Sequence, residues 1–165
     1  MADTNTNTTI IDGDKKVVQS FVHTYVDTGE GTAVKKIDVS ALATNTRGQA
    51  CTNVRITRIW FSTHGLTVKI LGNATTDVLL IELPTNYQGD LDFTSFGGIP
   101  NTAAGTAGAD GDIYFQTHGE GANDTYTLVV EGNCPNEYRC KYDPNGQEPN
   151  IDSVVDSLND SFKRK

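Results

Sequence analysis

The chain has 165 residues, enough for one domain with a hydrophobic core of its own. Its net charge of −8 disfavours binding to nucleic-acid phosphates, and its one basic cluster is the terminal Lys163 to Lys165. No apolar run reaches the roughly 20 residues of a membrane-spanning helix, and residues 1–14 lack the features of a secretory signal, so we expect a soluble protein made in the cytoplasm.

The chain begins with a polar segment and continues as a series of strand-like runs. Residues 1–9, rich in Thr and Asn, predict a mobile arm unless a partner holds it. Between residues 10 and 131 the strand-like runs are 15–26, 33–40, 52–61, 65–71, 77–83, 112–117 and 124–131. His64-Gly65 lies between two of them and predicts a tight hairpin. About eight strands without an intervening helix predict an all-β domain, an antiparallel β-sandwich or a jelly-roll-like fold.

A long connection of small residues follows Asp92. It begins with a glycine pair and a proline, and Asn101 to Ala109 then predict a surface loop that is flexible or ordered by a partner. The segment has neither the spacing of a phosphate-binding loop nor a nucleophile motif. Because it carries so little charge, we interpret it as a surface that packs on a neighbouring subunit. The expected contact residues are Gly97, Gly98, Pro100, Ala103 and Ala104.

The composition changes after Glu131. Residues 132–149 contain three of the five prolines and predict an extended linker. Residues 150–165 predict a short amphipathic helix that must dock on its own domain or on a neighbour. Its apolar face comprises Ile151, Val154, Val155, Leu158 and Phe162.

The three cysteines form no recognisable framework or metal motif. Cys134 and Cys140 lie six residues apart and could form a local disulfide or remain two free thiols. Cys51, beside a strand, is interpreted as a small buried hydrophobic residue. A zinc site is disfavoured, because no second pair of Cys or His follows at suitable spacing.

Other polar residues indicate no catalytic site. His64 and His118 each follow a strand in a Thr-His-Gly sequence and are interpreted as turn residues, and His23 as an ordinary half-buried one. Paired aspartates, Asp12 with Asp14 and Asp110 with Asp112, are first of all turn signals, although calcium binding there or near Asp143 stays open. We therefore expect no enzymatic activity, no cofactor and no dedicated metal site.

Several segments resemble small structural proteins of tailed bacteriophages, including those that infect marine cyanobacteria. The similarity covers about residues 10–131 and lies in the strings IIDGDKKVVQSFV, AVKKIDVSAL, CTNVRITRIWF, TTDVLLIEL, DFTSFGGIPN, GDIYFQT and DTYTLVVE. The resemblance implies a non-enzymatic virion component that binds the major capsid protein or other virion proteins, and we expect a homo-oligomer.

The acidic charge favours a place on the outside of the particle, away from packaged DNA. The leading hypothesis is a capsid decoration (cement) protein that stabilises the capsid lattice. One alternative is a tail adaptor or tube-associated subunit. Another is a carbohydrate-binding module, which requires at least two of Trp60, Tyr25, Tyr87 and Tyr114 to be exposed and coplanar.

Overall fold

The computed structural model describes residues 3–26 and 30–134, which form nine strands and two short 3₁₀ turns. The strands are β1 (Thr4–Asp12), β2 (Lys16–Thr24), β3 (Val34–Ile37), β4 (Arg55–His64), β5 (Thr67–Gly72), β6 (Val78–Leu83), β7 (Gln88–Asp92), β8 (Ile113–His118) and β9 (Thr125–Asn133). The 3₁₀ turns are η1 (Val39–Ala41) and η2 (Thr94–Phe96). The domain is therefore all-β, as predicted.

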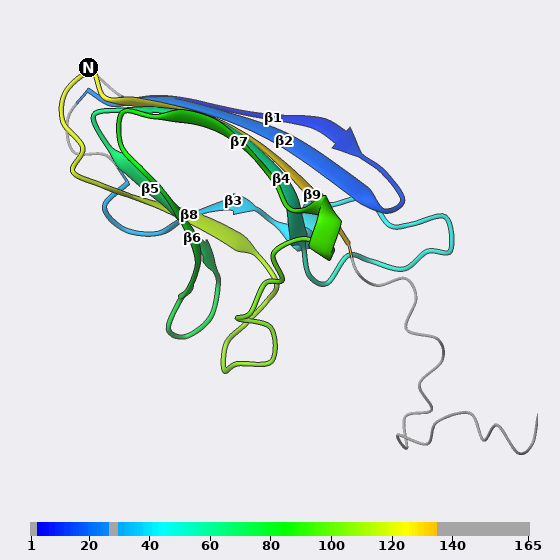
Figure 1. Ribbon diagram of the computed structural model, residues 1–165. Helices are drawn as coiled ribbons and strands as arrows, with labels where there is room; N and C mark the ends of the chain where they lie inside the picture. Colours follow the sequence, from blue (N-terminus) through cyan, green and yellow to red (C-terminus); the bar gives the residue numbers. More distant parts are fainter. Residues whose placement is uncertain (1–2, 27–29, 135–165) are drawn as a thin grey trace, which may run out of the picture.

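Two antiparallel sheets make up the fold. The first has five strands in the order β1-β2-β9-β4-β7, and the second has four in the order β3-β8-β5-β6. Figure 1 shows the five-stranded sheet as one layer and β5, β6 and β8 in the layer beneath it. Along strands such as β4 and β9, alternate residues point into the space between the layers. Phe21 from β2 meets Phe115 from β8 there edge to face, with ring centroids 4.9 Å apart.

The N-terminal segment is a strand and not the mobile arm that its composition predicted. β1 pairs with β2 from Thr4 opposite Thr24 to Asp12 opposite Val17. Polar Thr residues are β-branched and suit a strand, so a polar composition does not distinguish an arm from an edge strand. Side-chain carboxylates tie down both ends: Asp3 accepts from the Val26 amide at 2.8 Å, and Asp12 from the Ala43 amide at 2.9 Å.

The expected hairpin at His64-Gly65 is also wrong. β4 and β5 belong to different sheets, so this turn carries the chain from one layer to the other. The requirement for glycine is real, since Gly65 has a φ of +78° and a β-carbon there would overlap the Asp124 carboxylate. The sequence of a turn between two strand-like runs indicates that the turn is tight, but it does not show whether the two strands pair with each other.

The ends of the domain differ from the predicted boundaries. β9 extends to Asn133, so the first residues of the expected linker belong to the sheet. β7 was not foreseen, because its short polar sequence carries little strand signal. The rest of the linker and the helix predicted over 150–165, with Ile151, Val154, Val155, Leu158 and Phe162, lie outside the described residues.

Candidate functional site

The connection between β7 and β8 is ordered by contacts within the domain. The Asn101 side chain donates to the Gly111 carbonyl at 3.2 Å and accepts from the Ala103 amide at 3.1 Å. Ala103 is fully buried, and its methyl group packs over Gly72 of β5. The predicted contact role of Ala103 is therefore wrong, because this side chain is a core anchor. Ala104, its exposed neighbour, stays available.

The glycine pair has a backbone role. Gly97 ends η2 in the left-handed conformation and is exposed. Gly98 is buried with a φ of +90°, and a β-carbon there would lie 2.6 Å from the Ile56 carbonyl oxygen. This close approach lets Ile99 bridge to Ile56 of β4. Gly98 therefore shapes the loop and offers no side-chain surface to a partner, whereas Pro100 is exposed.

The tip of this loop packs against the β5–β6 turn, and together they form an open groove. The Thr75 amide donates to the Ala107 carbonyl at 2.8 Å, and Asn73 donates to Asp110 at 2.6 Å. The groove is lined by residues 74–79 with Thr106 and Ala107, and Asp77 is its one charged side chain. Figure 1 shows the two loops projecting from the same end of the sandwich.

The groove continues into the edge of the four-stranded sheet. β6 is an edge strand of sequence VLLIEL, and Leu79 is 51% exposed. Edge strands offer unpaired backbone groups to other chains, and natural proteins usually protect them with charge. Here the first four residues of β6 are apolar, and Glu82 is its one charged residue. The groove and β6 together form a surface, which we call the β6 surface, whose only charged side chains are Asp77 and Glu82, on a strongly acidic protein.

The aromatic residues do not form a platform for a sugar. Tyr25 is fully buried, whereas Trp60 is 42% exposed on the outer face of the five-stranded sheet, opposite Val129 and Asp90. Tyr87 is 58% exposed just before β7, and its ring lies 6.0 Å from that of Phe61, a buried residue of β4. Tyr114 belongs to β8 in the other sheet. Three different locations cannot supply the coplanar rings that the carbohydrate hypothesis requires.

A charged cluster that the sequence did not reveal lies between the sheets. Lys36 forms an ion pair with Glu30, and their side chains are 0% and 8% exposed. Tyr126 donates its hydroxyl to Glu30 at 3.0 Å. His23 Nδ1 lies 3.3 Å from Glu30, and its Nε2 lies 3.8 Å from the Asp3 carboxylate. Nothing in the sequence around His23, or around the Lys35-Lys36 pair, indicated that the side chains of His23 and Lys36 lie close together.

Burial dominates the electrostatics of this cluster. It lowers the pKa of His23, with the Lys36 charge acting in the same direction and Glu30 and Asp3 opposing it. Burial also raises the pKa of Tyr126, and the Glu30 charge adds to the effect. Such shifts are found at active sites and in structural ion-pair networks alike. With the His23 side chain 4% exposed and that of Lys36 0%, no substrate reaches these groups, which favours the structural role.

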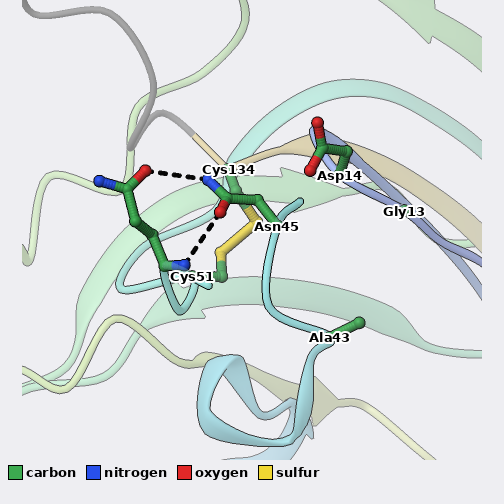
Figure 2. A pocket seen from close by; sticks show the side chains of 7 residues that line it. Gly13, Asp14, Ala43, Asn45, Cys51 and Cys134 are labelled. Atoms are coloured by element: carbon green, nitrogen blue, oxygen red, sulfur yellow. Dashed lines mark hydrogen bonds between the residues drawn. A yellow bond between two sulfur atoms is a disulfide. The ribbon is translucent and has the colours of Figure 1, made fainter. Parts of the chain in front are cut away.

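The cysteines pair differently from the prediction. Cys134, just after β9, is bonded to Cys51, and not to Cys140, which lies outside the described residues. Cys51 is therefore not a lone buried thiol. Figure 2 shows the bond beside a small hollow that Gly13, Asp14, Ala43, Asn45 and Gln49 also line. The hollow offers about 10 Å³ to a water-sized molecule, so it is too small for an organic ligand.

The paired aspartates serve as ties between loops. Asp12 and Asp14 accept from the backbone amides of Ala43 and Thr46. Asp112 is buried, accepts from the Val39 amide at 2.9 Å and lies 2.6 Å from Lys35 Nζ. Each of these carboxylates thus organises a neighbouring loop. Within residues 3–26 and 30–134, no group of three or more His, Cys, Asp or Glu side chains is placed to hold a metal ion.

His64 and His118 are both exposed, at the ends of β4 and β8. In the described part of the chain, no helix has the length and apolar character needed to cross a membrane. No protein-family model, curated protein or solved structure matches the chain.

Proposed function

We propose that this chain is a non-enzymatic capsid decoration protein of a tailed bacteriophage, which binds the outer surface of the capsid lattice through the β6 surface. The observation that carries the proposal is the groove with one charged side chain beside an edge strand whose first four residues are apolar, on a protein with a net charge of −8. Apolar surface of this kind marks sites of protein association. The sequence resemblance supplies the kind of partner, the major capsid protein.

Two further features support an external structural role. The disulfide between Cys51 and Cys134 suits a protein that works outside the reducing cytoplasm, as the surface of a released particle does. The acid–base groups of the buried cluster are closed to substrates, which supports the proposal of a non-enzymatic protein. The jelly-roll-like connectivity, the C-terminal linker and the amphipathic helix stay predictions.

The first experiment counts copies of this protein per major capsid protein in purified particles, by quantitative mass spectrometry. A decoration protein gives a simple ratio to the capsid protein. A low copy number per particle, with the protein recovered in the tail fraction after disruption, would instead assign it to the tail adaptor or tube. Complete absence from particles would overturn the virion assignment.

A pair of variants then tests the β6 surface. Leu79→Lys places a charge on the exposed apolar edge and should lower the affinity for undecorated capsids by at least about tenfold, because central apolar contacts dominate such interfaces. Val34→Lys is the matched control: Val34 is also exposed, at 38%, but lies on β3 at the opposite edge of the same sheet. Equal binding by both variants would exclude the β6 surface as the contact.

A further inference from the structure

β1 is an edge strand whose side chains take no part in the core. All nine of its residues are exposed, including Asn5 and Asn7, which lie opposite the inward-facing His23 and Phe21 of β2. The four-stranded sheet therefore does not cover the inner side of β1. One backbone edge and both faces of this strand are accessible to another molecule.

β1 also lacks the usual protection of an edge strand. It is nine residues long, contains no proline, and carries no charge from Thr4 to Ile11. Its one irregularity is a register shift between Thr9 and Ile11, close to its end. By contrast β7, the opposite edge of the same sheet, is five residues long and carries Asp90 and Asp92. Short length and charge are the means by which natural sheets avoid edge pairing.

The sequence of β1 is suited to pairing with itself. An antiparallel pair centred on Asn7 sets Thr6 of each copy opposite Thr8 of the other, and Asn5 opposite Thr9. From residue 5 to residue 9 every opposed pair then consists of hydroxyl or amide side chains, which are favourable cross-strand neighbours, and Thr4 lies opposite Ile10. Two copies of a chain with a net charge of −8 repel each other, so an uncharged edge is where their backbones can approach at least cost.

We propose that the β1 strands of two copies pair antiparallel about a twofold axis near Asn7. The two five-stranded sheets then become one continuous sheet. The contact is isologous, so it closes at a dimer. A single strand pair is a small interface, and we expect a reversible dimer rather than a permanent one. The inference does not depend on the capsid assignment, because it concerns the purified protein alone.

Sedimentation velocity on the full chain tests the proposal with two variants. The wild-type protein should dimerise with a Kd below ~100 µM. Asn7→Lys sets two lysines directly opposite each other at the centre of the pair and should weaken the dimer by at least about tenfold. Gln88→Lys is the control, since Gln88 is an exposed polar residue on the opposite edge strand and the change of charge is the same. It should dimerise like the wild type.

Amide hydrogen exchange gives a second readout that does not rely on a substitution. Protection at residues 4–9 should rise with protein concentration, whereas protection in β7 should not. A wild-type protein that stays monomeric at ~100 µM would overturn the proposal. So would a dimer that Asn7→Lys leaves intact, provided that the thermal midpoint of the variant shows an intact fold.

Discussion

Cys51 and Cys134 are joined by a disulfide that spans 83 residues of sequence and fastens the end of β9 to the segment that precedes β4. A loop of this length corresponds to about 4.5 kcal/mol of lost conformational entropy in the unfolded chain. We expect reduction to lower the free energy of unfolding by about 2–5 kcal/mol, measured by chemical denaturation with and without a reductant. The Cys140→Ser variant should show the same loss, whereas Cys51→Ser should lose the dependence on the reductant.

The ion pair of Lys36 and Glu30 leads to a second prediction. Lys36→Met leaves the Glu30 carboxylate buried without its cation, and the free energy of unfolding should fall by about 3–5 kcal/mol. Removing both charges in Lys36→Met with Glu30→Gln should cost less than the single substitution, because no buried charge then lacks a partner. Lys69→Met, at a half-buried lysine on β5, is the control and should change stability by no more than about 0.5 kcal/mol. Equal losses for the single and double variants would contradict the role of the pair.

Stability should also fall in mild acid because of His23. Its pKa is lowered in the folded protein from 6.5, so the unfolded chain binds more protons as the pH falls below that value. The free energy of unfolding should therefore decrease from about pH 6.5 downward, until the lowered pKa is passed. Asp38, Asp90 and Asp92, whose pKa values are lowered from 3.8 by hydrogen bonds, add to the loss only in stronger acid.

Denaturation curves between about pH 5 and 7 measure this effect. His23→Gln should flatten the dependence on pH in that interval, because the titrating group is gone. His64→Gln, at an exposed histidine, should keep the wild-type slope. A slope that His23→Gln leaves unchanged would show that burial of this imidazole is not its source.

Gly98 and Gly105 form a matched pair for the β7–β8 connection. Their φ angles are +90° and +89°, so alanine pays a similar conformational cost at both sites, about 1–2 kcal/mol. A β-carbon at Gly98 also meets the Ile56 carbonyl oxygen at 2.6 Å, whereas none of the atoms described lies within 4 Å of one at Gly105. Gly98→Ala should therefore be the more destabilising variant in thermal denaturation. Equal losses would show that the loop shifts freely away from β4.

Ala103 and Ala104 lie in the same loop but differ in burial, so lysine substitutions at the two sites test how firmly the loop is held. Ala103→Lys forces a charge into the core beside Gly72 and should lower the free energy of unfolding by more than about 2 kcal/mol. Ala104→Lys places its charge in solvent and should change stability by no more than about 0.5 kcal/mol. Chemical denaturation compares the two, and a tolerated Ala103→Lys would mean that the loop opens easily.

The all-β class and the positions of most strands could be predicted from the sequence, because alternation of apolar and polar residues is a local property of the chain. Val68 and Ile70 of β5, for example, are buried as their spacing predicts. Local patterns also located the turn at Gly65, where only glycine fits. They could not show which strands pair, since pairing joins segments distant in sequence. That β4 and β5 lie in different sheets became evident only from the folded structure.

Local patterns likewise predicted some features of the surface and core, whereas others depend on contacts between distant segments. The sequence indicated that the loop after β7 is small and uncharged, but only folding buried Ala103 and left Ala104 outside. His23, Glu30 and Lys36 meet because two sheets close over them. Cys51 reaches Cys134 across 83 residues because β4 and β9 pair within one sheet, with Arg55 opposite Asn133. The Thr and Asn residues that make up the first part of β1 predicted an arm, and only the pairing with β2 makes this segment a strand. Long-range contacts, which no local pattern encodes, settled each of these points.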